Sequence, residues 1–196
     1  GGMVQLKEII NSIFNSKSYL VQYEQSHVYL IDCGDIEPIV KWCKENEKVI
    51  KGVFITHSHF DHIYGLNELI DYYPNCVVYV SRESKEALYS DRLNFSLYHE
   101  KSFVFLGDHV RLLEDGDKVE LWKDLYLEVI ATPGHAKGCL CYKIDHYLFT
   151  GDAYIPGIKA VTTLRGGNKE DNEKSLAKIR SLLSADTVVC AGHAIK

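Results

Sequence analysis

The sequence predicts an α/β fold built on mixed sheets. Short apolar runs alternate with amphipathic stretches along the chain, as expected when strands alternate with helices. Pairs of apolar runs separated by short polar turns indicate hairpins, and hairpins exclude a purely parallel sheet. The 196 residues are the size of one domain without linkers or repeats, so we expect a single domain over residues 3–196. Gly1 and Gly2 are interpreted as the remnant of a cleaved tag.

The first half of the chain is expected to begin with a hairpin. Residues 24–26 are polar and separate two apolar stretches. A later amphipathic stretch must end before Pro74, because proline cannot continue a helix. The expected strands are residues 19–23, 27–31, 49–55 and 76–80, and the expected helices are residues 36–45 and 62–72.

The second half repeats this alternation. Asn168 precedes an amphipathic stretch and is expected to cap its helix, because the asparagine side chain accepts hydrogen bonds from the first free N–H groups. The expected strands are residues 125–130, 139–144, 147–149 and 187–190, and the expected helix is residues 170–183.

Composition narrows the class of partner. The formal charge of −5 comes without a run of Lys or Arg, which argues against a nucleic-acid partner. No apolar run approaches the roughly 18 residues that span a bilayer, and the N-terminus lacks the features of a signal peptide. We therefore expect a cytoplasmic protein that acts on a small molecule, without a membrane partner; the sequence leaves its oligomeric state open. The six cysteines are scattered without a CxxC pair, so we expect buried, reduced thiols.

A cluster of metal-ligating residue types follows the expected strand at residues 49–55. The segment 56–62 reads THSHFDH and brings together His57, His59, Asp61 and His62. Histidine is the commonest metal ligand, and this density of imidazoles indicates a metal-binding loop. The alternative is a loop whose histidines are only solvated or capped. Three further turns argue against it.

These three turns each follow an expected strand and carry one more potential ligand. They read TPGH at residues 132–135, TGD at 150–152 and AGH at 191–193. A glycine directly precedes each ligand, and a residue without Cβ lets the backbone turn sharply toward a shared cavity. We expect His135, Asp152 and His193 to join the loop at residues 56–62.

The four motifs, in this order, resemble the metal-binding motifs of the metallo-β-lactamase superfamily, and the resemblance covers essentially the whole chain. The segment LIDCG at residues 30–34 also resembles an early family motif whose aspartate braces the metal loop, which gives Asp32 a structural role. The resemblance implies a four-layer αββα sandwich, with two mixed sheets, helices on the outer faces and the metals at one edge between the sheets.

The resemblance also implies a ligand set for two divalent metal ions. The first site would use His57, His59 and His135, the second would use Asp61, His62 and His193, and Asp152 would bridge the two. Three neutral imidazoles leave a fourth position open for water, as in catalytic zinc sites. Zinc is the expected metal, and iron and manganese stay open, because mixed imidazole and carboxylate sites accept all three.

The expected function is metal-dependent hydrolysis. A metal pair holds a hydroxide at neutral pH and stabilises the charges that develop during attack, and Asp61 is the expected catalytic proton acceptor. The motifs resemble the glyoxalase II (hydroxyacylglutathione hydrolase) and lactonase branches, which implies a thioester, ester or lactone substrate. Two enzymatic alternatives stay open: a mononuclear iron persulfide dioxygenase and a phosphodiesterase or nuclease. A non-catalytic binding module is the remaining class.

Substrate contacts are expected from the segment at residues 153–168. Tyr154 is a candidate hydrogen-bond donor to an oxyanion, and Lys159 or Arg165 a candidate partner for a carboxylate or phosphate, against ordinary surface roles for all three. The chain ends three residues after His193, so we expect it to lack the helical extension with which glyoxalase II proteins bind glutathione. His99 lies in a region that often lines a pocket in this family.

Overall fold

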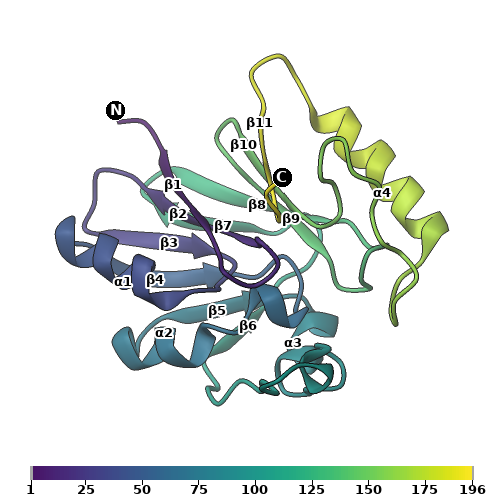
Figure 1. Cartoon of the computed structure of the whole chain (residues 1–196). Helices are drawn as coiled ribbons and strands as arrows, with labels where there is room; N and C mark the ends of the chain where they lie inside the picture. Colours follow the sequence, from purple (N-terminus) through teal and green to yellow (C-terminus); the bar gives the residue numbers. More distant parts are fainter. Residues whose placement is uncertain (1, 196) are drawn as a thin grey trace.

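Two mixed sheets form the centre of the computed structural model, which describes residues 2–195 (Figure 1). Gly1 of the predicted tag remnant and Lys196 lie outside the described residues. The first sheet has the order β1-β2-β3-β4-β5-β6, with antiparallel pairing from β1 to β3 and parallel pairing from β3 to β6. Its strands are β1 (Gln5–Ile10), β2 (Lys17–Gln22), β3 (His27–Ile31), β4 (Val49–Phe54), β5 (Val77–Val80) and β6 (Val110–Leu112).

The second sheet has the order β11-β10-β9-β8-β7. Its neighbours pair antiparallel except for β10 and β11, which run parallel. Its strands are β7 (Lys118–Trp122), β8 (Leu125–Ala131), β9 (Leu140–Ile144), β10 (Tyr147–Gly151) and β11 (Val188–Ala191).

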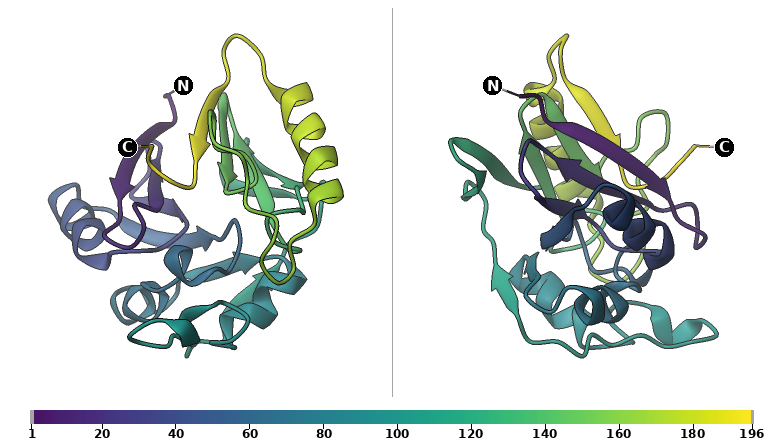
Figure 2. Two further views of the ribbon diagram at one scale, coloured as in Figure 1. Left: turned by 45° about the vertical axis from the view of Figure 1, so that its right-hand side comes forward. Right: turned by 90° about the vertical axis from the view of Figure 1, so that its left-hand side faces the viewer.

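Helices cover the outer faces of both sheets, as the left view of Figure 2 shows. Buried side chains of α1 and α2 pack against the first sheet, and Ile179 of α4 packs against the second. The helices are α1 (Ile36–Glu45), α2 (Leu66–Tyr72), α3 (Arg82–Leu88) and α4 (Lys169–Leu182), with 3₁₀ turns at Phe60–His62 and Ser96–Tyr98. The four-layer αββα sandwich with two mixed sheets, predicted from the sequence, is confirmed.

Alternation along the strands separates two apolar cores on the faces of the first sheet. In β2, Leu20 packs toward the helices, whereas Tyr19 and Val21 face the second sheet. In β3, Leu30 likewise packs toward the helices, and Ile31 faces the second sheet. Successive side chains of a strand point to opposite faces, so a strand covered on both faces is apolar throughout. The strand ends are thereby fixed between two packed layers.

Four expected elements begin later than predicted, among them the strands expected at residues 139–144 and 187–190, which begin at Leu140 and Val188. The helix expected at residues 62–72 begins at Leu66, and the strand expected at 76–80 begins at Val77. His62 belongs to a 3₁₀ turn, where its carbonyl oxygen accepts a hydrogen bond from Cys33 N, and Gly65 N donates to the Cys33 carbonyl. These bonds to a neighbouring segment replace the helical hydrogen-bond ladder, which delays the helix by one turn.

Asn168 caps α4 as expected, because its Oδ1 accepts a hydrogen bond from Asp171 N. Four elements, β1, β6, β7 and α3, were not predicted from the sequence. No helix among residues 2–195 combines the length and the apolar character that spanning a bilayer requires.

Candidate metal centre

Four turns at strand ends meet at one edge of the two sheets. They follow β4, β8, β10 and β11, and they carry the residues that the motifs single out. Gly151 has φ 52°, and a Cβ there would lie 2.7 Å from Thr56 Oγ1. At Gly192 a Cβ would lie 2.4 Å from Asp152 Oδ1. The turns before Asp152 and His193 therefore require glycine, because any side chain would push a ligand loop away.

The seven predicted ligands form two groups of converging side chains. Within each group, one ligand atom of every residue lies within 4.8 Å of the others. The first group consists of His57, His59 and His135, and the second group consists of Asp61, His62, Asp152 and His193. The structure therefore brings together side chains that are far apart in the sequence.

Asp152 lies between the two groups. Its Oδ2 is 3.6 Å from His57 Nε2 and 3.4 Å from His135 Nε2, both in the first group. The same oxygen is 3.1 Å from His193 Nε2, and Oδ1 is 3.3 Å from His62 Nε2, both in the second group. This carboxylate thus contacts imidazoles on both sides, which is the position that a bridging ligand needs.

Hydrogen bonds from Nδ1 to backbone carbonyls orient two of the imidazoles. His135 Nδ1 is 2.7 Å from the Val161 carbonyl oxygen, and His193 Nδ1 is 2.9 Å from that of Phe14. A carbonyl only accepts, so each Nδ1 carries a hydrogen and donates it. Nε2 is therefore the nitrogen left for a metal, an arrangement typical of histidine ligands. His135 Nε2 points at His59 Nδ1, 3.2 Å away.

Asp32 braces the second group, as the sequence analysis expects. Its carboxylate accepts hydrogen bonds from Thr56 N at 2.7 Å, from Thr56 Oγ1 at 2.6 Å and from His62 Nδ1 at 2.9 Å. The residue has φ 58°, a conformation that aspartate tolerates better than most side chains. Asp32 thus ties the beginning of the ligand loop to the orientation of His62.

Two imidazoles of the first group, His57 and His59, are kept neutral mainly by burial. Burial and the neighbouring imidazoles lower the pKa of His57 well below its ordinary value, and they lower the pKa of His59 to about 4. The nearby carboxylates act in the opposite direction and do not compensate. Neutral imidazoles present lone pairs to a cation without first releasing a proton.

The second group shows the opposite shift. Burial acts to lower the pKa of His62, but Asp61, Asp152 and Asp32 together raise it well above its ordinary value. Burial likewise opposes the charge of His193, yet its hydrogen bonds to Asp152 and Asp61 raise its pKa to about 10. The same pairing overcomes burial and lowers the pKa of both Asp61 and Asp152. The nearby carboxylates therefore favour the charged forms of His62 and His193.

The donors fit divalent metal ions. His57 Nε2 is buried and finds no hydrogen-bond partner among the described residues, although it points toward Asp152. A buried nitrogen without a partner is unfavourable unless a ligand occupies the space before it. Three imidazoles in one group and two imidazoles with two carboxylates in the other are donor sets that Zn, Fe and Mn accept.

The turn between β1 and β2 supports the second group, which the sequence analysis did not anticipate. Besides the Phe14 carbonyl on His193, Asn15 O accepts a hydrogen bond from Ala194 N, and Ser16 Oγ donates to the Asp61 carbonyl at 2.7 Å. Phe14 and Asn15 both have positive φ, at 56° and 54°. The turn contains no glycine, so its sequence carries little sign of this conformation.

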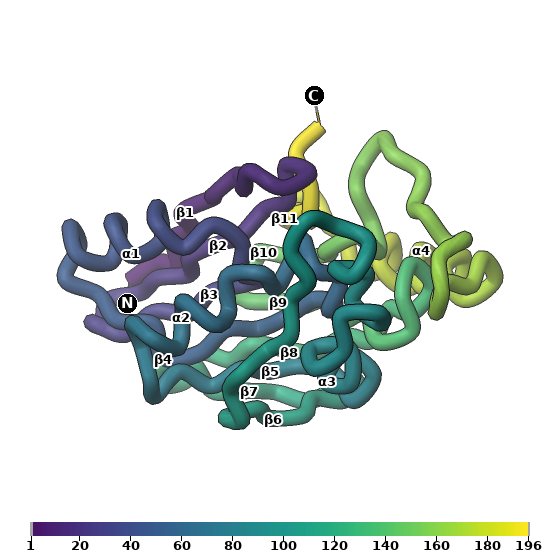
Figure 3. Tube along the Cα trace, turned by 60° about the horizontal axis from the view of Figure 1, so that its bottom comes forward, coloured from purple at the N-terminus to yellow at the C-terminus, as the bar shows by residue number. Residues whose placement is uncertain are grey.

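A cavity of about 330 Å³ opens onto both groups. His59, Asp61, His135 and Asp152 line it together with aromatic and aliphatic side chains, and His99 contributes to its wall. The segment between β10 and α4, which contains Val161, arches beside the C-terminal residues (Figure 3).

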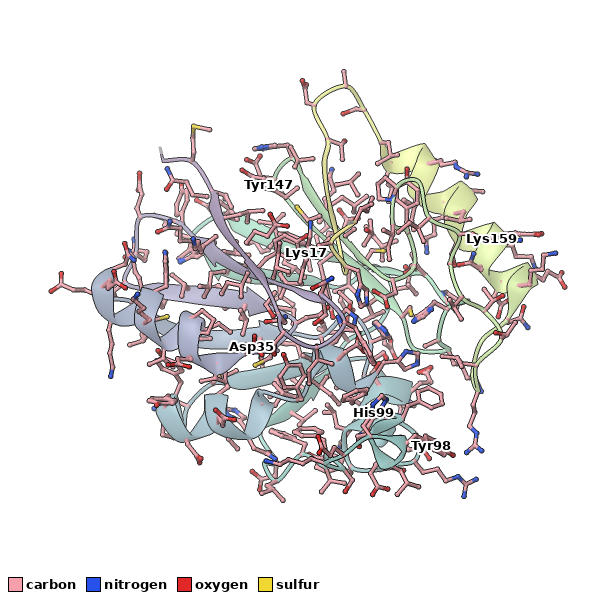
Figure 4. The ribbon with its side chains drawn as sticks, in the orientation of Figure 1. Lys17, Asp35, Tyr98, His99, Tyr147 and Lys159 are labelled. Carbon is pink, nitrogen blue, oxygen red and sulfur yellow. The ribbon has the colours of Figure 1, made fainter. Side chains whose placement is uncertain are left out.

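The three candidate substrate contacts lie elsewhere. Tyr154 and Lys159 line a cavity of about 610 Å³ beside α4, and Arg165 lines a smaller cavity of about 150 Å³ that also touches His59. Figure 4 shows Lys159 beside α4, whereas Tyr98 and His99 lie together lower in the view, away from that helix. Their roles in substrate binding stay predictions.

Comparisons with known proteins agree with this architecture. The family model of the metallo-beta-lactamase superfamily matches residues 12–193. A hydroxyacylglutathione hydrolase of Salmonella gallinarum is 31% identical over 175 residues, which are 89% of this chain and 60% of that protein. The chain thus spans 60% of the length of this curated relative.

Two solved structures share the fold. BLEG-1 B3 metallo-beta-lactamase superposes with a TM-score of 0.90 at 25% identity, covering 97% of this chain and 92% of that one. TTHA1623, solved in a di-iron-bound form, gives a TM-score of 0.82 at 23% identity over 96% and 92% of the two chains, a likeness of fold alone. With a family model that matches nearly its whole length, the chain belongs to the metallo-beta-lactamase superfamily.

Proposed function

We propose that the protein is a hydrolase with two divalent metal ions, and that it cleaves a small thioester, ester or lactone. The observation that carries the proposal is the pair of ligand groups that share Asp152 at the floor of one cavity. The first ion would be held by His57, His59 and His135, and the second by Asp61, His62 and His193, with Asp152 shared. When bound, such a pair supplies an activated water nucleophile and polarises the scissile carbonyl.

The chain's own residues have distinct tasks in this reaction. Asp61 lines the cavity and has a lowered pKa, so it is a carboxylate at neutral pH and is proposed to accept the proton of the attacking water. Asp32 and the carbonyls of Phe14 and Val161 hold the imidazoles in one orientation. Products are a carboxylic acid and a thiol or alcohol, so no external oxidant or reductant is needed.

Zinc is proposed as the metal, because three imidazoles with an open position are typical of catalytic zinc. The di-iron form of TTHA1623 shows that this fold accepts iron in another protein, so iron must be measured beside zinc. The name of the Salmonella relative points to thioesters, but only part of that protein's length is matched, so the thioester class is itself part of the proposal. Absence of nucleic-acid and membrane partners and a cytoplasmic location stay predictions.

The test is metal analysis of the purified protein combined with a hydrolysis screen over thioesters, lactones, β-lactams and phosphodiesters. We expect two ions per chain, and turnover of thioesters or lactones that chelation abolishes and zinc restores. Turnover unaffected by complete metal removal would contradict the proposal. One iron per chain with consumption of O₂ would favour the dioxygenase alternative, and cleavage confined to phosphodiesters would favour the nuclease alternative.

A further inference from the structure

The entrance to the metal cavity is lined by a set of apolar side chains, here called the aromatic mouth. It consists of Phe14, Phe60, Phe95, Tyr98, Val161 and Leu164. Phe14 and Phe60 meet edge to face with ring centroids 5.8 Å apart, and Phe95 stands edge-on to the candidate ligand His59 at 4.9 Å. The mouth therefore begins directly at the ligand groups.

Backbone conformation sets two of these aromatic residues apart. Phe14 has φ 56° and Phe95 has φ 67°. Positive φ is uncommon for residues other than glycine, asparagine and aspartate, and for a bulky side chain it costs free energy. Within residues 2–195, the other non-glycine residues with positive φ are Asn15, Asp32, Glu47, Asp124 and Asp145, and none of them is apolar. Strain held at aromatic residues beside a candidate active site indicates a functional use of their side chains.

Four of the six side chains of the mouth are exposed, whereas Phe60 is buried. Phe14 is 59% exposed and Tyr98 is 69% exposed, and Val161 and Leu164 are exposed as well. Their apolar surface lies around a floor of imidazoles and carboxylates instead of being buried in a core. A contiguous apolar surface at the rim of a polar cavity is typical of a ligand-binding site.

Charge in the cavity argues against an anionic ligand tail. None of the described side chains that line it is Lys or Arg, so the outer part of a ligand meets no cationic side chain of these types there. Lys159 and Arg165 line the two other cavities. A carboxylate on the distal part of a substrate would lose its hydration in the mouth without gaining a charged partner.

We propose that the aromatic mouth binds the acyl group of the substrate and selects an uncharged, apolar one, such as a phenylacetyl or medium-length alkanoyl group. The inference rests on the proposed hydrolase function and names its substrate class. A volume of about 330 Å³ is at the lower end of ligand pockets, so preference should rise with acyl length and then level off.

The test uses metal-loaded protein and acyl thioesters of N-acetylcysteamine, a neutral thiol. The acyl series is acetyl, butyryl, hexanoyl and phenylacetyl, and succinyl serves as the charged counterpart of butyryl. We expect kcat/KM to rise by up to about fourfold per methylene until the cavity is filled, because each buried methylene adds a fixed increment of transfer free energy. Succinyl should be cleaved more slowly than butyryl.

Phe14→Gly is the decisive variant. Glycine adopts positive φ freely and retains the carbonyl that holds His193, so the variant should fold and keep its metal while losing one wall of the mouth. The kcat/KM of Phe14→Gly should depend less on acyl length than that of the unmodified protein. Glu47→Gly is the matched control, since it relieves φ 55° at an exposed residue outside the cavity. Tyr98→Ser, on an exposed side chain, repeats the test if the first variant is unstable.

A non-hydrolysable series separates this inference from the hydrolase proposal. Affinities of S-alkyl and S-benzyl thioethers of N-acetylcysteamine, measured by calorimetry, should follow the same order and lose it in Phe14→Gly. Thioether binding that depends on chain length without any hydrolysis would contradict only the hydrolase. Hydrolysis that is equal across the acyl series, or fastest for succinyl, would overturn the aromatic mouth and leave the hydrolase standing.

Discussion

The first and second ligand groups both take residues from one short loop, yet they differ in charge. His57 and His59 belong to the first group, and Asp61 and His62 follow directly in the second. In the first group burial keeps His57 and His59 neutral. In the second, carboxylates raise the pKa of His62 and His193 despite burial.

The difference in pKa between His62 and His57 follows from the balance between the attraction of nearby carboxylates and the cost of burying a charge. His62 Nε2 lies 3.4 Å from Asp61 Oδ2, a separation at which two unit charges attract by about 5 kcal/mol at an effective dielectric constant of 20. Burying one ion costs several kcal/mol. A single carboxylate therefore roughly offsets the cost for His62, and Asp152 and Asp32 make the charged form favourable. His57 has only Asp152, at 3.6 Å, and the neighbouring His62 and His59 disfavour its charged form as well, so burial prevails.

The largest expected effect is at Asp152, the residue common to both groups. Asp152→Asn should lower kcat by more than about a hundredfold and reduce the content of both ions, because even an outer partner of a metal ligand is worth 10–100-fold. Metal analysis and kinetics check it, and circular dichroism should show a retained fold. The matched control is Asp145→Asn at an exposed turn, which should keep both ions. Two ions at full rate in Asp152→Asn would show that no bridge exists.

Asp32→Asn should weaken metal binding at the second ligand group and leave binding at the first group intact. Asparagine tolerates φ 58°, and its Oδ1 still accepts from Thr56 N, but its NH₂ group, in the place of Asp32 Oδ2, accepts neither from Thr56 Oγ1 nor from His62 Nδ1. We expect affinity for the second ion to fall by about 10–100-fold while the first is retained. Competition with a chelator measures both affinities. Equal weakening of the two ions would argue against separate groups.

The smallest effect concerns the turn that supports only the second group. Ser16→Ala removes the hydrogen bond to the Asp61 carbonyl and should lower the free energy of unfolding by about 1 kcal/mol without loss of the first ion. Denaturant unfolding measures it. Ser181→Ala, at an exposed position of α4, should change stability by less than about 0.5 kcal/mol. Loss of the first ion in Ser16→Ala would show that the turn supports both groups.

Local signals explain why the ligand motifs were visible in the sequence. Each motif joins a strand to a turn, and the glycine before Asp152 or His193 marks a turn that only glycine permits. The segment 27–31 alternates between two apolar faces, and Asn168 caps α4 with its own side chain. These features depend on neighbours in the sequence.

The remaining features depend on contacts between distant segments. β1 is mostly exposed, and its turn to β2 holds positive φ at Phe14 without a glycine. α3 is a short helix with only Ser84 and Leu88 buried, so it lacks a clear apolar periodicity. The aromatic mouth gathers Phe14, Phe95 and Leu164 from three separate parts of the chain, and no local pattern links them.

The central claim is that the two ligand groups differ in charge before a metal binds. Its most direct test is a zinc titration of chelator-treated protein in weak buffer, with proton release recorded. We expect two ions per chain. Binding at the first group should release no proton from His57 or His59, whereas binding at the second should displace up to two, from His62 and His193.

The direction in which pH changes the affinity for the second ion follows from the raised pKa of His193, about 10, because protons compete with the ion below that pH. Affinity for the second ion should therefore fall by about tenfold per displaced proton for each unit of decrease in pH between pH 8 and 6. Asp32→Asn, which should retain the first ion, assigns the proton-free step to the first group. A single ion per chain, or equal proton release with both ions, would contradict the account.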